Sequence, residues 1–181
     1  MKRRKMTALT VALAVCLIAG AAVAPANANF VMVDKNPYGG TAIKAPGLKE
    51  IILTVHNGSK VKTYSMANLL ALKSSTISIY EPFVQKQQKF TVIPLAYFFT
   101  ASSISAKMKV DTIALNDYIY TNTAKNFTDA KAYLAFQLAG KPIGYDQGGP
   151  IRIIFPTDSK WSKFLDPWNW SLRDIAVKRT G

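Results

Sequence analysis

The chain has 181 residues, and its 23 lysines and arginines outnumber its 10 acidic residues, which gives a formal net charge of +13. This length suits one domain, and an apolar share of 49% excludes a disordered polycation. The chain holds one cysteine, Cys16, and one histidine, His56, which excludes a disulfide framework and a structural zinc site of about four Cys/His ligands.

The first 28 residues have the layout of a secretory signal peptide. A basic cluster at residues 2–5 precedes an apolar core at residues 8–24, and Ala26-Asn27-Ala28 supplies small residues for cleavage. We therefore expect export to the periplasm. Removing 28 residues leaves a mature chain of 153, with 19 basic and 10 acidic residues, a charge of +9, and no cysteine. A retained anchor and a lipoprotein at Cys16 are alternatives, although the apolar core is short for a membrane span of about 20 residues.

Residues 29–48 are rich in proline, glycine and small side chains, and we expect them to form an N-terminal arm on a domain of residues 49–181. Strands are predicted over 51–55 and 61–64, because Asn57-Gly58 between them is a strong hairpin signal. Ser65 is the predicted cap of a short helix over 66–72.

Further along, short apolar runs alternate with turn residues. Strands are predicted over 76–80 and 90–93, with a polar loop at 85–89 between them and a helix opened by Pro94 after them. Strand and helix compete over the apolar run at 132–138. Other strands are predicted over 109–115, 118–121, 151–155 and 172–177. Short strands with a few brief helices indicate an α+β domain that is mainly β.

Several blocks of sequence occur in an order that is informative when taken together. They cover residues 90–99, 114–118 and 133–143, then Gly-Gly-Pro-Ile-Arg at 148–152 with the strand and proline that follow it, and finally Trp-Asn-Trp at 168–170. Together they resemble the oxidoreductase molybdopterin-binding domain, the catalytic core of the sulfite oxidase family. The resemblance spans about residues 51–177. It implies a sulfite-oxidase-type fold that holds the molybdenum cofactor in a cleft, with one cysteine thiolate on the metal.

This chain departs from that family at the metal ligand. The family's cysteine follows a strand after the first helix, and the matching region here, residues 76–82, contains none. Glu81 lies in this region, but a carboxylate is a hard ligand and replaces a thiolate poorly on such a metal. We therefore expect that sulfite-oxidase-type chemistry is lost and that no metal is bound.

The resemblance also implies cofactor-binding residues. Arg152 matches an arginine of the family that helps to bind the pterin cofactor, and a guanidinium can donate two parallel hydrogen bonds to a phosphate or a pterin edge. The alternative is a buried structural arginine paired with an acid such as Asp146. Gln147 aligns with a histidine of the family, and Asn116 with an acidic residue, although Asn116-Asp117 is also ordinary turn chemistry.

Other candidates are aromatic or basic. Tyr80, Tyr118, Trp168 and Trp170 could stack on a flat heterocycle, or belong to the core. Lys160 and Lys163 lie where the family places basic groups near the cofactor phosphate, or in a solvated loop. The predicted cofactor-binding set is Arg152, Asn116, Gln147, Asp117, Tyr118, Tyr80, Glu81, Lys160 and Trp170.

Three functions follow as hypotheses. Some cysteine-less periplasmic proteins that resemble this domain bind pterins and act as partners of membrane receptors that make or degrade cyclic-di-GMP. The first hypothesis is therefore a non-catalytic periplasmic pterin-binding protein that regulates the periplasmic domain of such a diguanylate cyclase or phosphodiesterase. The second is a molybdenum-cofactor-dependent oxidoreductase or its subunit. The third is an exported basic domain that binds anionic polymers; nucleic acid is not an expected partner.

Overall fold

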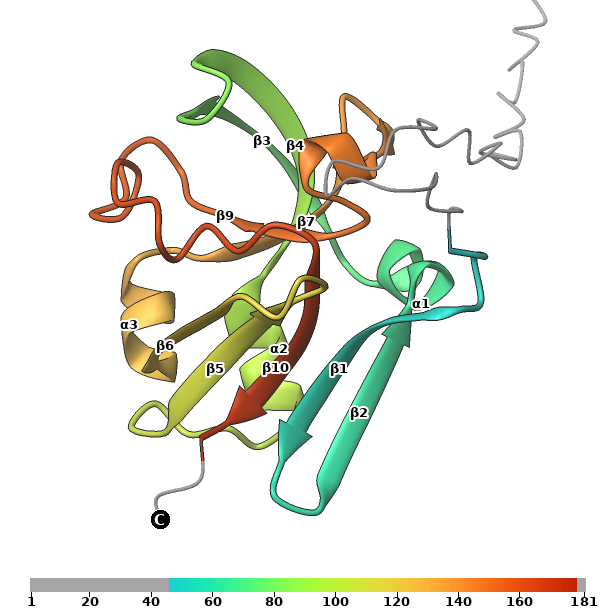
Figure 1. Ribbon diagram of the computed structural model, residues 1–181, viewed down its shortest axis with the longest axis vertical. Helices are drawn as coiled ribbons and strands as arrows, with labels where there is room; N and C mark the ends of the chain where they lie inside the picture. Colours follow the sequence, from blue (N-terminus) through green and yellow to red (C-terminus); the bar gives the residue numbers. More distant parts are fainter. Residues whose placement is uncertain (1–45, 179–181) are drawn as a thin grey trace, which may run out of the picture.

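The computed structural model describes residues 46–178, and Figure 1 shows two β-sheets with short helices beside them. The predicted signal peptide, and all of the predicted arm except residues 46–48, lie outside the described residues. The mainly-β α+β fold class agrees with the structure. Among the described residues, no helix is long and apolar enough to cross a membrane.

The first sheet has five strands and joins both ends of the domain. In hydrogen-bonded order they are β2 (Lys60–Ser65), β1 (Ile51–Asn57), β10 (Leu172–Val177), β5 (Lys109–Ala114) and β6 (Ile119–Thr123). β10 runs parallel to β1 and antiparallel to β5, so the last strand lies in the middle of the sheet. Gly58 has a positive φ of 60° in the tight β1–β2 turn, as the Asn-Gly signal predicts.

The second sheet is antiparallel throughout. Its strands are β3 (Ser75–Glu81), β4 (Lys86–Pro94), β7 (Tyr133–Leu138), β8 (Lys141–Pro142) and β9 (Arg152–Ile154), with β8 and β9 both paired to β7. The competition between helix and strand at residues 132–138 is resolved as strand β7. Its central residues Leu134, Ala135 and Phe136 are all buried, as expected for a strand flanked on both sides.

In the part of the chain that the structure describes, four short helical segments connect the strands. They are α1 (Met66–Ala71), α2 (Leu95–Ala101), α3 (Ala124–Asp129) and the 3₁₀ helix η1 (Tyr145–Gln147). The predicted cap of α1 is confirmed, because Ser65 Oγ accepts from the Asn68 backbone N–H at 3.2 Å. The sequence analysis missed α3, which is anchored by buried Phe127 and whose cap, Thr123, accepts from the Asn126 N–H at 3.2 Å.

The predicted polar loop at residues 85–89 is wrong. β4 begins at Lys86, and Lys86–Lys89 pair with residues 78–81 of β3, which leaves Gln85 in the turn with a positive φ of 53°. Figure 1 shows this hairpin extending beyond the rest of its sheet. Residues 86–89 are polar and none of them is buried, so they carry no apolar face from which a strand could be predicted.

One continuous core joins the two sheets and the helices. Aromatic side chains fill much of it, and those that are almost completely buried are Phe90, Phe98, Phe127, Phe136 and Phe155. The helices α2 and α3 meet through the rings of Phe99 and Phe127, whose centroids are 6.1 Å apart. The connections β3–β4, β5–β6 and β9–β10 join the strands around this core and together line one cleft.

Candidate functional site: an aromatic cleft

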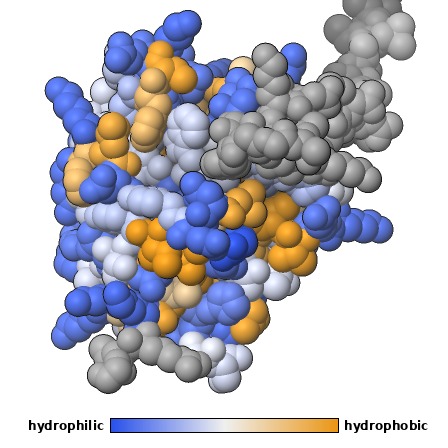
Figure 2. All heavy atoms as spheres, in the orientation of Figure 1, coloured by the Kyte–Doolittle hydropathy of each residue, from blue (hydrophilic) through white to orange (hydrophobic). Residues whose placement is uncertain are grey.

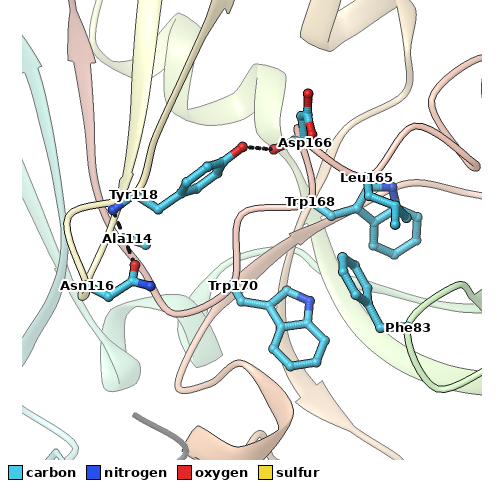
Figure 3. A pocket seen from close by; sticks show the side chains of 8 residues that line it. All are labelled: Phe83, Ala114, Asn116, Tyr118, Leu165, Asp166, Trp168 and Trp170. Carbon is cyan, nitrogen blue, oxygen red and sulfur yellow. Dashed lines mark hydrogen bonds between the residues drawn. The ribbon is translucent and has the colours of Figure 1, made fainter.

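A cleft of about 360 Å³ opens between three connections that are far apart in the sequence (Figure 3). This volume lies near the lower end of the range for small-molecule sites, about 300–1,000 Å³. The β3–β4 connection contributes one lining residue, the end of β5 and its turn contribute three, and the β9–β10 connection contributes four. The lining residues are Phe83, Ala114, Asn116, Tyr118, Leu165, Asp166, Trp168 and Trp170.

Aromatic rings form the walls of the cleft. The centroid of the Phe83 ring lies 5.0 Å from that of Trp170 and 6.2 Å from that of Trp168, both in edge-to-face geometry. Phe83 remains 44% exposed although it is a large apolar side chain. Such rings offer flat apolar surface to an incoming heterocycle.

Apolar side chains also surround the cleft. In Figure 2, orange groups of apolar residues interrupt a mostly hydrophilic face. Several of the exposed large hydrophobic residues of the described chain come from the three connections that build the cleft; they are Phe83, Val84, Leu115, Tyr118, Phe164 and Leu165. An exposed apolar cluster around a cleft is typical of a binding site.

The polar side of the cleft lies on the β5–β6 turn. Asn116 Oδ1 accepts from the Tyr118 backbone N–H at 3.2 Å, and Figure 3 shows the Asn116 amide nitrogen turned toward the cleft. The Tyr118 hydroxyl donates to the Asp166 carbonyl at 3.0 Å. Burial raises the pKa of the Tyr118 phenol, and the neighbouring Asp166 and Tyr120 raise it further, so the phenol remains a donor at neutral pH.

Behind the Trp170 wall lies a buried ion pair. Arg152 Nη2 is 2.7 Å from Glu81 Oε1, and the two side chains are only 3% and 0% exposed. Arg152 Nη1 donates to the Gln147 carbonyl at 3.0 Å, and the guanidinium carbon lies 4.2 Å from the centroid of the Trp170 ring. Burial lowers the pKa of Arg152 to about 10, while Glu81 opposes this shift, so the guanidinium is charged at neutral pH.

The second oxygen of the Glu81 carboxylate reaches the β3–β4 loop. Glu81 Oε2 accepts from the Val84 backbone N–H at 2.7 Å. Two buried donors near this pair, Arg152 Nε and Trp170 Nε1, have no hydrogen-bond partner among the described residues. The pair is therefore built into the wall of the cleft and is not open to solvent.

The structure brings together most of the residues predicted from the sequence. Asn116, Tyr118 and Trp170 line the cleft, and Trp168 does so as well. Glu81, Arg152 and the backbone of Gln147 meet behind it. The acid that pairs with Arg152 is Glu81, where the sequence suggested Asp146 as the alternative partner. That Arg152 contacts a ligand stays a prediction, since its guanidinium is buried.

Three predicted residues lie apart from the cleft lining. Asp117 occupies the β5–β6 turn with a positive φ of 61°, and its carboxylate is 3.1 Å from Arg173 Nη1. Tyr80 is 45% exposed, and its backbone N–H donates to Thr157 Oγ1 at 3.1 Å. Lys160 Nζ lies 5.5 Å from the centroid of the Trp161 ring.

The sequence analysis did not single out Phe83, Ala114, Leu165 or Asp166. Phe83 and Val84 are apolar residues in a turn between polar strands. This is the one feature of the sequence that could have indicated Phe83 as a site residue. The other three carry no pattern, because a connection that folds over the end of a sheet has no periodicity.

The molybdenum cofactor does not fit these residues. The chain's single cysteine, Cys16, is not part of the matching sequence region at residues 76–82, where the buried carboxylate of Glu81 is paired with Arg152. The residues that line the cleft offer aromatic surface and the amide of Asn116.

No protein-family model matches the sequence, and none of the curated proteins matches it. Among solved structures, a similar fold occurs at low sequence identity. The sulfane dehydrogenase SoxCD from Paracoccus pantotrophus superimposes with a TM-score of 0.58 at 12% sequence identity. The match covers 77% of this chain and 41% of that chain, so this protein spans less than half the length of that relative. At such low identity the likeness shows the fold alone.

Proposed function

We propose that this protein binds a pterin, or a similar flat heterocycle, in the aromatic cleft and that it does so without metal chemistry. The observation that carries the proposal is the cleft itself, with rings of Phe83, Trp168 and Trp170 on its walls and the amide of Asn116 at its polar side. The fold supports the ligand class, because its distant structural relatives belong to a molybdopterin-dependent type.

The chemistry of the cleft suits such a ligand. A pterin is a planar ring system with a polar edge of alternating donors and acceptors. The aromatic walls can contact its faces and edges, while the Asn116 amide N–H can donate to its carbonyl or a ring nitrogen. Since Asn116 Oδ1 is held by Tyr118, the amide nitrogen has a fixed direction.

A titration with tetrahydrobiopterin tests the proposal. We expect Phe83→Ala to weaken binding about two- to tenfold, because an aromatic contact contributes about 0.5–1.5 kcal/mol beyond its buried area. The matched control is Tyr97→Ala, an aromatic residue of similar exposure at 41% on α2 that does not line the cleft. Equal affinities of the two variants, both folded, would contradict the assignment of the cleft.

The second candidate is a molybdenum-dependent oxidoreductase or its subunit, and the likeness to a sulfane dehydrogenase favours it. The donor set at Glu81 argues against it. Metal analysis of the protein purified from the periplasm without chelators decides between them. We expect no stoichiometric molybdenum, and a stoichiometric amount would overturn the metal-free proposal.

The regulatory part of the proposal concerns location and partner. We propose a periplasmic protein whose pterin-loaded form binds the periplasmic domain of a membrane diguanylate cyclase or phosphodiesterase. The ligand can act as a signal only if the loaded and empty forms differ in affinity for that domain. The test measures the affinity of the purified receptor domain for both forms. Equal affinities would exclude a ligand-dependent switch.

A further inference from the structure

We propose that the buried Glu81–Arg152 ion pair is the positioning device of the cleft, and that it fixes the two aromatic walls at their working separation. This inference rests on the proposed function, since it names the residues that hold the ligand site in shape. Glu81 of this pair lies in the region, residues 76–82, that matches the segment in which the resembling family has its metal-ligating cysteine.

The carboxylate holds the first wall. Glu81 is the last residue of β3, and its Oε2 accepts from the Val84 N–H at 2.7 Å. Val84 directly follows Phe83, so this bond closes the loop on which the Phe83 ring is carried. Because Phe83 is 44% exposed, little else packs on that side chain from outside.

The guanidinium holds the second wall. Its carbon lies 4.2 Å from the centroid of Trp170, and Nη1 donates to the Gln147 carbonyl at 3.0 Å. The next residue, Gly148, packs so closely on the Trp170 ring that a Cβ there would lie 2.5 Å from Trp170 Cδ2. One planar cation thus ties the indole to the η1 segment.

The contacts form a closed circuit. The Phe83 loop is bonded to the carboxylate, the carboxylate to the guanidinium at 2.7 Å and the guanidinium to Trp170, whose ring centroid is 5.0 Å from that of Phe83. A buried ion pair is weak evidence for stability, because desolvation of the two charges offsets their attraction. Its geometric role explains better why two charges are kept here in a protein without the metal ligand.

The test replaces the pair by apolar side chains of similar size. We expect the double variant Glu81→Leu/Arg152→Met to fold with little change in Tm, since such replacements are often neutral. Its affinity for tetrahydrobiopterin should fall about tenfold or more, as happens when supporting partners of metal sites are removed. Hydrogen exchange of the Val84 amide should also accelerate, and this readout needs no ligand.

Two control variants and one substitute variant keep the result interpretable. Lys131→Gln/Asp158→Asn removes an exposed ion pair and should leave affinity and Val84 exchange unchanged. Leu69→Ala lowers stability from the core and should leave the affinity of the folded protein unchanged. If the double variant does not fold, Arg152→Lys replaces it as the test variant, because lysine keeps the charge but loses the planar contact with Trp170.

Wild-type affinity together with wild-type Val84 exchange in the double variant would overturn the inference. If the wild-type protein does not bind the pterin, the proposed function fails. In that case the Val84 exchange rate alone decides whether the pair positions the loop, so the two failures are distinguishable.

Discussion

Gly148 adopts a positive φ of 77°, and its Cα faces the Trp170 ring. Any side chain at this position would meet Trp170 Cδ2 at 2.5 Å and Cγ at 2.6 Å, and these are atoms of a rigid ring. Gly140 has almost the same φ, 76°, but a Cβ there would have nothing within 4 Å. Alanine substitutions at the two glycines therefore distinguish the free-energy cost of backbone strain from the free-energy cost of displacing the Trp170 ring.

Gly148→Ala should destabilise the protein by about 2–5 kcal/mol, because left-handed backbone costs about 1–2 kcal/mol and overpacking about 1–3 kcal/mol. Gly140→Ala should show only the cost of the left-handed backbone, about 1–2 kcal/mol. Urea unfolding measures both variants against wild type. Equal losses would mean that the Trp170 ring moves aside without cost.

The sequence indicated that Arg152 matters, but it could not supply its partner. Acid–arginine pairs across a fold follow from topology, and Glu81 lies 71 residues earlier, at the end of a strand in the same sheet. Asp146 is close in sequence but belongs to η1. Asn116 was predicted through the family resemblance and Trp170 as an aromatic residue near a strand end, whereas Phe83 lies in a hairpin turn that carries no such pattern.

At the scale of elements, β2 is held to α2 by Tyr64, whose ring centroid is 5.1 Å from that of Phe98 in edge-to-face contact. Tyr64 is 8% exposed. Burial raises the pKa of its phenol above the ordinary value of 10.0, and Tyr97 adds to the shift. The folded state thus keeps the phenol neutral at a pH where the unfolded chain ionises it.

The sign of the pH effect follows from proton linkage. Below pH 10 both states are protonated and the contribution of Tyr64 is complete. Above it the unfolded state loses its proton first, so the free energy of unfolding falls as pH rises. Tyr64→Phe removes this titration, and we expect its stability to fall less than that of wild type between pH 9 and pH 11. Parallel pH profiles in chemical denaturation would contradict the assigned burial effect.

The element boundaries were predictable where hydrophobic periodicity and caps coincide, as at Ser65 and α1. They were not predictable at the start of β4, where residues 86–89 are polar and none is buried, or at α3, where Ala124 and Phe127 are the only buried residues of six. At 132–138 the competition was settled by pairing with β4, β8 and β9, which is information that no local window contains.

At the scale of the whole molecule, the fold class followed from the order of several weak blocks, and the structural likeness at 12% identity agrees with it. The cleft could not be foreseen as a unit, because it joins residue 83 to residues 114–118 and 165–170. Those segments meet only after both sheets are formed.

The overall positive charge and the largely uncharged cleft predict different salt dependences for ligand binding. The described cleft is lined by aromatic, apolar and uncharged polar groups, with Asp166 as its one ionisable acid. Affinity for a neutral pterin should therefore change little between low and high salt. An exported domain that binds anionic polymers would lose affinity steeply with salt. Titrations with the pterin and with heparin, as the polyanion probe, at two ionic strengths distinguish these two functions.

The central place of β10 also sets the order in which the molecule can assemble. The hairpins β1–β2 and β5–β6 are local, but they remain separate until residues 172–177 arrive between them. Trp170 lies two residues before that strand, so the second wall of the cleft is positioned together with the last strand of the domain. Partly folded chains therefore lack the complete ligand site, and ligand present during refolding stabilises only the finished protein.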